Sequence, residues 1–133
     1  MYTDVYYDLE IVDTLLSKSS DTELFPITFM FIRVRMGDRY FSRDAIFRIM
    51  DFIKGSMGKN HVTAELSKGY FVVIMYKTDL AAAEKTREEM LSKWEAFSKG
   101  AELETVLREV VSTENPRNTF YHEKDRLLDL ANW

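Results

Sequence analysis

Residues 25–35 read Phe-Pro-Ile-Thr-Phe-Met-Phe-Ile-Arg-Val-Arg, and this stretch decides the fold. β-Branched and aromatic side chains dominate it, and apolar residues occupy both sets of alternating positions as far as Arg33. A strand that is apolar on both faces is typical of the centre of a sheet that is covered on both sides. The stretch therefore predicts a buried central strand.

The other elements follow from the spacing of apolar residues and from the polar residues between them. Ser42, and either Thr78 or Asp79, are suitable helix N-caps. Residues 67–69, Ser-Lys-Gly, are a short connection typical of a hairpin, and Asn115-Pro116 marks a turn. The expected helices are 4–18, 43–56, 80–97 and 121–131, and the expected strands are 25–35, 61–66, 70–77 and 102–111.

The resulting order is helix, β, α, β, β, α, β, helix, which contains the split βαβ pattern. We therefore predict an α+β, ferredoxin-like fold, in which a four-stranded antiparallel sheet carries two helices on one face. The length of 133 residues fits a single domain, 1–133. Its core would cover about residues 24–112, with helical extensions at 4–18 and 120–131.

Composition excludes several classes of protein. The formal net charge of -4 disfavours binding of nucleic acid through a basic surface, and the absence of cysteine excludes disulfides and Cys-based zinc sites. His61 and His122 have no ligand spacing, so we expect no metal and no cofactor. The longest apolar run is shorter than the roughly 20 residues of a membrane span, and no signal peptide is visible. We expect a cytoplasmic protein without a membrane span.

Residues 66–80 read Leu-Ser-Lys-Gly-Tyr-Phe-Val-Val-Ile-Met-Tyr-Lys-Thr-Asp-Leu, and a helix rich in Ala and Glu follows. This run resembles GGDEF domains, the diguanylate cyclase domains of bacterial signalling. In that family an apolar strand, a Thr-Asp-Leu-like cap and an Ala/Glu-rich helix follow the signature hairpin, and residues 25–34 are similar to the family's first core strand. The resemblance covers roughly residues 24–112.

The defining motif of the family is missing. Where GGDEF domains have Gly-Gly-Asp/Glu-Glu-Phe, residues 67–71 are Ser-Lys-Gly-Tyr-Phe. The resemblance places the family's magnesium-binding carboxylates at Arg33-Val34-Arg35 and at Tyr70. Magnesium requires hard oxygen ligands, whereas a guanidinium repels the cation. The resemblance therefore implies a degenerate, non-enzymatic domain without catalytic residues or a metal site.

Arg33, Arg35 and Lys68 form a candidate ligand-binding site. The two arginines have strand spacing and point to one face, and Lys68 lies in the hairpin. The site would bind the phosphates of a nucleotide or a cyclic dinucleotide. Alternatively, the four arginines of this stretch form ordinary surface ion pairs, which mark no function; they are Arg33, Arg35, Arg39 and Arg43. The acidic residues considered as their partners are Glu65, Glu104 and Asp38.

The terminal segments carry more apolar residues than a polar tail requires. They either cover the open face of the sheet or, through residues such as Leu127 and Trp133, dock a protein partner or a second copy. An exposed sheet edge is a further place for such contacts. The leading hypothesis is a non-catalytic regulatory or scaffolding protein of bacterial signalling. The alternatives are a nucleotide or cyclic-dinucleotide sensor, and an unrelated ferredoxin-like enzyme or RNA-binding module. An RNA-binding module would stack bases on Phe29, Phe31, Tyr70 and Phe71.

Overall fold

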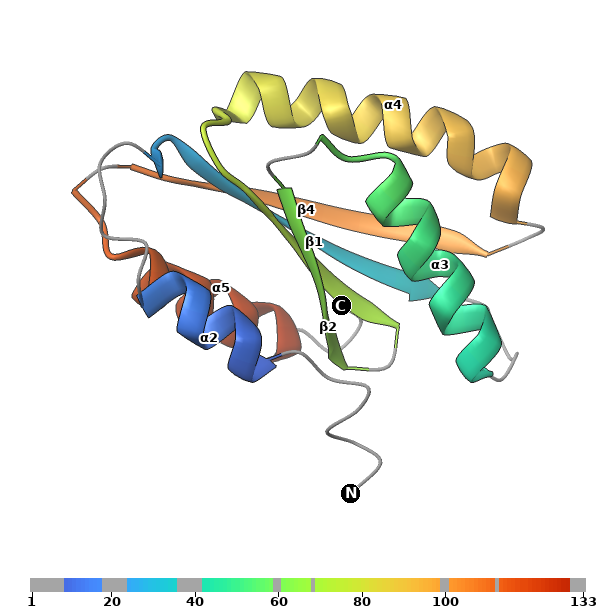
Figure 1. The fold of residues 1–133 in the computed structure, drawn as a ribbon, viewed down its shortest axis with the longest axis horizontal. Helices are drawn as coiled ribbons and strands as arrows, with labels where there is room; N and C mark the ends of the chain where they lie inside the picture. Colours follow the sequence, from blue (N-terminus) through green and yellow to red (C-terminus); the bar gives the residue numbers. More distant parts are fainter. Residues whose placement is uncertain are drawn as a thin grey trace.

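A four-stranded antiparallel sheet lies between two layers of helices in the computed structural model of the chain (Figure 1). The strand order is β2-β3-β1-β4. The structure describes residues 9–17, 24–35, 42–58, 61–67, 69–98, 101–111 and 113–129. The elements are α2 (Leu9–Ser17), β1 (Ile27–Arg35), α3 (Arg43–Gly55), β2 (His61–Ser67), β3 (Tyr70–Met75), α4 (Leu80–Ser98), β4 (Glu102–Val110) and α5 (Pro116–Asp129).

This arrangement confirms the predicted split βαβ fold. β1 is a central strand, and β3 and β4 both pair with it in antiparallel orientation. All its residues from Ile27 to Ile32 are buried, as its apolar sequence predicts. Gly69 in the β2–β3 connection has a φ of 79°, which glycine adopts without steric cost. Among the described helices, none is long and apolar enough to cross a membrane.

Helices α3 and α4 cover one face of the sheet (Figure 1). Ser42 caps α3 by accepting the Ala45 N–H at 3.1 Å, and Asp79 caps α4 by accepting the Ala82 N–H at 2.8 Å. Ala83 of α4 faces the sheet and is buried, whereas the adjacent Ala82 is exposed. The apolar side chains of α3 and α4 that are fully or almost fully buried are Ile46, Ile49, Ile53, Ala83, Met90 and Trp94.

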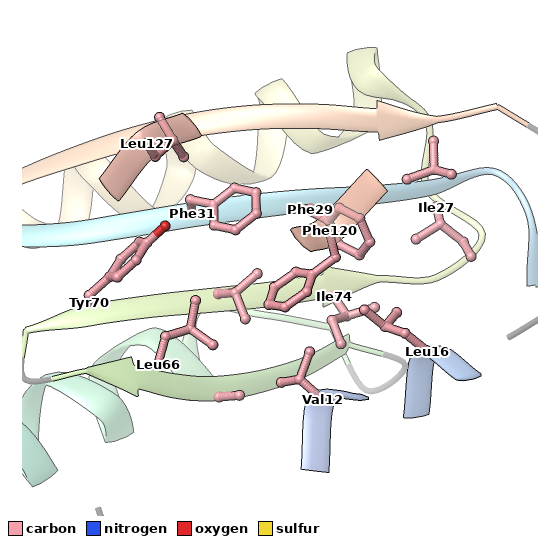
Figure 2. Packing of buried hydrophobic residues seen from close by; sticks show 13 residues of the cluster. Val12, Leu16, Ile27, Phe29, Phe31, Leu66, Tyr70, Ile74, Phe120 and Leu127 are labelled. Carbon is pink, nitrogen blue, oxygen red and sulfur yellow. The ribbon is translucent and has the colours of Figure 1, made fainter. Parts of the chain in front are cut away.

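Helices α2 and α5 cover the opposite face, so both faces of the sheet are covered (Figure 2). The ring of Phe120 on α5 lies 5.7 Å from that of Phe29 and 5.9 Å from that of Phe31, measured between centroids. Val12 of α2 joins the same cluster. The described parts of the two terminal segments therefore cover the open face of the sheet, which was the first of the two alternatives for these segments.

Helix α5 begins earlier than the sequence analysis expected, at Pro116. The Asn115 carboxamide oxygen accepts the Asn118 N–H at 3.1 Å, and the Asn115 carbonyl accepts the Thr119 N–H at 3.0 Å. Asn115 is thus an N-cap, and Pro116 occupies the first helical position, where its missing N–H costs nothing. The other described ends differ from expectation by one or two residues, and residues 4–8, 18 and 130–131 of the expected helices lie outside the described residues.

Candidate functional site

The arginines of the predicted ligand site lie at the end of β1, on the face that α2 and α5 cover. In the sheet register Arg33 is opposite Tyr70 of β3 on one side and Glu104 of β4 on the other. The Arg35 Nε donates to the Glu104 Oε1 at 2.5 Å. Lys68, the third predicted ligand, lies outside the described residues. For Arg35 the ion-pair alternative is therefore confirmed.

Glu65, another expected partner of the arginine cluster, pairs with Arg43, a member of that cluster, which confirms the ion-pair alternative for Arg43 as well. Its side chain is only 3% exposed and lies on the opposite face of the sheet, beneath the start of α3. There its two carboxylate oxygens accept from the two terminal nitrogens of Arg43, both at 3.2 Å. The third expected partner, Asp38, lies outside the described residues.

Tyr70 is a core residue, although the resemblance assigns its position to a metal ligand. Its ring packs 6.3 Å from that of Phe31, and the residue is 5% exposed. Burial raises the pKa of the phenol above its ordinary value, and the nearby carboxylates of Glu123 and Asp125 raise it further. Tyr70 is consequently a neutral phenol at physiological pH.

The predicted contact residue Leu127 is also in the core. It is 1% exposed and belongs to the cluster beneath α5 (Figure 2). A side chain that is buried within its own chain offers no contact area to a partner, so we no longer place a docking surface on Leu127. Trp133 lies outside the described residues. Among those residues, no group of three or more His, Asp or Glu is placed to hold a metal ion.

Within the described residues, no strand pairs with the outer edge of β4. β4 is a terminal strand of the sheet, and its nine residues pair with β1 in an unbroken register. From Leu103 to Glu109 every residue is half-buried. A strand edge presents unpaired N–H and C=O groups, which another strand can pair with. The β4 edge is therefore our candidate site.

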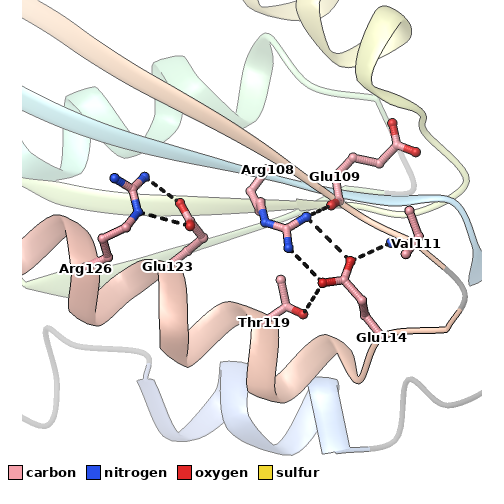
Figure 3. Close-up of polar contacts among 7 residues, drawn as sticks. All are labelled: Arg108, Glu109, Val111, Glu114, Thr119, Glu123 and Arg126. Atoms are coloured by element: carbon pink, nitrogen blue, oxygen red, sulfur yellow. Dashed lines mark hydrogen bonds and ion pairs between the residues drawn. The ribbon is translucent and has the colours of Figure 1, made fainter.

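A cluster of polar contacts holds β4 against the start of α5 (Figure 3). The Arg108 Nη2 donates to the Glu114 Oε2 at 2.7 Å, and its Nη1 donates to the Glu109 carbonyl. Glu114 also accepts the Val111 N–H at 3.0 Å. The pKa of Glu114 is lowered, first by this backbone hydrogen bond and then by Arg108, although burial opposes the shift.

Helix α4 fixes the same strand from the other face. The Glu109 carboxylate accepts the N–H of Leu80, in the first turn of α4, at 2.7 Å. At the opposite end of β4, the Trp94 Nε1 donates to the Ala101 carbonyl at 3.0 Å. The edge strand is thus held by contacts from both helical layers.

Exposed apolar side chains gather at the end of β4. Val111 is 50% exposed and Leu80 is 38% exposed. A hollow of about 340 Å³ adjoins Val111. Its lining residues are Phe25, Pro26, Glu109, Val110 and Val111. This end of the strand can therefore contribute apolar contacts to an interface that forms along the edge.

Two further hollows, of about 330 and 370 Å³, lie between α2 and α5. Asp13 lines both hollows. Its carboxylate accepts from the Arg117 Nε at 2.7 Å and from the Tyr121 hydroxyl at 2.9 Å. These hydrogen bonds, that of Tyr121 first, lower the pKa of Asp13. Asp13 and Arg117, the charged residues that line both hollows, thus pair with each other within the chain.

No family model matches this chain, and neither the curated proteins nor the solved structures contain a significant match. A function for the chain therefore has to be argued from the geometry of its own residues.

Proposed function

We propose that this chain is a non-catalytic, cytoplasmic domain that acts through protein contacts. It would be a regulatory or scaffolding protein of bacterial signalling. One observation carries the proposal: helices cover both faces of the sheet, whereas no other strand in the described part of the chain pairs with the nine-residue outer edge of β4. Addition of a strand to such an edge is a common way for a protein to bind a partner.

The sheet register supports the GGDEF-like component of this proposal. The resemblance assigns magnesium-binding carboxylates to the end of the first strand and to the hairpin, and these positions have to be close together to share an ion. Arg33 and Tyr70 are direct neighbours across β1 and β3. A guanidinium and a buried neutral phenol occupy the two positions, and neither is a ligand that magnesium prefers. We therefore propose that the domain has lost cyclase chemistry.

Binding of RNA to the sheet has less support. Stacking of bases requires aromatic rings that are exposed on the sheet surface. Phe29 and Phe31 are 0% exposed, and Phe120 packs against both of them. The rings that suggested this alternative therefore belong to the core.

Thermal unfolding with GTP or a cyclic dinucleotide, each with magnesium, tests the proposal. A ligand at 100 times its Kd would raise the Tm by about 5 °C or more. We expect the Tm to stay within about 1 °C of its ligand-free value, and chromatography to detect no cyclic product from GTP. A nucleotide sensor would be supported instead if a ligand raised the Tm and Arg33→Ala abolished that rise. The control variant Arg48→Ala, on the exposed side of α3, should then preserve the rise.

A further inference from the structure

We propose that the partner of the β4 edge is a second copy of this chain, paired antiparallel about a twofold axis at Val106. The inference rests on the proposed function and names the partner. Such pairing would join the two four-stranded sheets into one, because a twofold axis perpendicular to the sheet keeps the same helical layer on the same side in both copies.

The charge pattern of β4 is complementary to itself. The strand reads Glu-Leu-Glu-Thr-Val-Leu-Arg-Glu-Val, and Val106 is its central residue. An antiparallel pair centred there places Glu104 of each copy opposite Arg108 of the other, on the face that carries α5. Cross-strand pairs of opposite charge stabilise a sheet. Val106 would face its own copy between the two ion pairs.

Other registers are less favourable. A twofold axis at Glu104 would place two glutamates opposite each other, and an axis at Arg108 would oppose two arginines, which destabilises strand pairing. An axis at Thr105 would also place Glu102 opposite Arg108, but it would pair only residues 102–108 and would leave Glu109 and Val110 outside the paired stretch. Only the axis at Val106 pairs the strand along its whole length from Glu102 to Val110.

The two edges of the sheet differ in a way that favours β4. The register between β2 and β3 shifts between Glu65 and Ser67, whereas the register of β4 with β1 runs unbroken. Irregularities of this kind protect an edge from pairing with another strand.

The β4 edge is also fixed in place before a partner arrives. Glu114 holds Arg108, and Glu109 holds the start of α4. Binding by a strand that is already ordered loses little conformational entropy. At the end of the strand, the half-exposed Val111 would pack opposite Ala101 of the second copy, which covers apolar surface.

Cysteine cross-linking tests the position of the axis. The chain has no cysteine, so Val106→Cys introduces a single thiol. Directly opposite residues have Cα atoms about 4.5–5.5 Å apart, within the range for a disulfide. We expect Val106→Cys to form a disulfide-linked dimer under mild oxidation and Thr105→Cys, whose copies would be diagonal, to form little. The inference would be wrong if only Thr105→Cys formed the disulfide-linked dimer efficiently, or if neither variant formed it.

A charge exchange tests the contacts themselves. Glu104→Arg and Arg108→Glu should each raise the dimer dissociation constant about tenfold or more in sedimentation equilibrium, because each opposes like charges twice. An equimolar mixture of the two variants restores both opposite-charge pairs, so we expect it to associate like the wild type. Asp51→Arg, an exposed site on α3, is the matched control and should associate normally.

The mixture also separates intermolecular from intramolecular effects. Glu104→Arg loses the pair with Arg35, and Arg108→Glu loses the pair with Glu114, and mixing restores neither. Recovery in the mixture therefore reports contacts between copies, and a mixture as weak as either variant contradicts the proposal. If the wild type stays monomeric at every concentration, the proposal that the partner is a second copy is wrong. The proposed function is contradicted by a different result, which is binding or turnover of a nucleotide.

Discussion

Glu114 joins β4 to α5 through a single carboxylate that binds Arg108, the Val111 N–H and the Thr119 hydroxyl (Figure 3). All three groups donate hydrogen bonds, so they favour the charged form of Glu114 and lower its pKa in the folded chain. The unfolded chain, with its ordinary pKa, binds the proton more tightly. The contribution of Glu114 to stability is therefore present above the ordinary pKa and is lost as the pH falls through the folded value.

Glu114→Gln should lower the free energy of unfolding by about 1–2 kcal/mol at pH 7, since hydrogen bonds to a charged group are lost. The difference from the wild type should be smaller at pH 3, because a larger fraction of Glu114 is protonated there than at pH 7. Urea unfolding at the two pH values measures both effects, with Glu88→Gln on the exposed side of α4 as control. A difference that stays constant between the two pH values would contradict this role of the carboxylate.

Arg43 neutralises a carboxylate that is almost completely buried. Arg43→Met should lower the free energy of unfolding by about 2–4 kcal/mol, because it removes the two-point partner of Glu65. The double variant Arg43→Met/Glu65→Leu should recover a large part of this loss. Arg48→Met, exposed on the same helix, should change stability by less than about 0.5 kcal/mol. Equal losses for Arg43→Met and Arg48→Met would show that the ion pair does not matter.

The sequence predicted the candidate site only in part. It indicated that a β1 arginine pairs with a glutamate, and Arg35 with Glu104 confirms this. It did not show that Glu65 faces the opposite helical layer, because the face that a strand residue occupies depends on a register set by the whole sheet. Leu127 was expected at a docking surface because local composition does not show which neighbouring element buries a helical side chain.

Phe120 anchors the N-terminal half of helix α5 to the sheet. Phe120 is 0% exposed and lies between Phe29 and Phe31 of β1. Phe120→Ala should lower the free energy of unfolding by about 3–5 kcal/mol in denaturant, because the rigid sheet cannot fill the cavity. Ile11→Ala, at a side chain that is 56% exposed, should change it by less than about 0.5 kcal/mol. A small effect of Phe120→Ala would mean that α5 does not cover the sheet in solution.

Most elements could be predicted because local signals agreed with one another. The alternating and helical spacings located all four strands and the described helices, and Ser42 and Asp79 cap helices as expected. The start of α5 was placed too late because Asn115-Pro116 was interpreted as a turn. The same dipeptide equally suits a helix start, with Asn as the N-cap and Pro as the first helical residue. In the structure Asn115 caps the helix, which begins at Pro116.

The whole molecule is a sheet with two covered faces and two unequal edges. The helices take up the apolar side chains of both faces, and an irregular register interrupts the β2 edge. The β4 edge is regular, firmly held and self-complementary in charge. At this scale the central claim is that β4 is the surface through which the chain associates.

Amide hydrogen exchange at low and high protein concentration tests this claim most directly. Alternate N–H groups of an edge strand point away from its neighbour, and they become protected only when another strand pairs with them. We predict that these alternate amides between Glu102 and Val110 exchange quickly at low concentration and at least about tenfold more slowly at high concentration. The amides of β2 should not change. Exchange in β4 that is independent of concentration, or protection that appears in β2 instead, would contradict the claim.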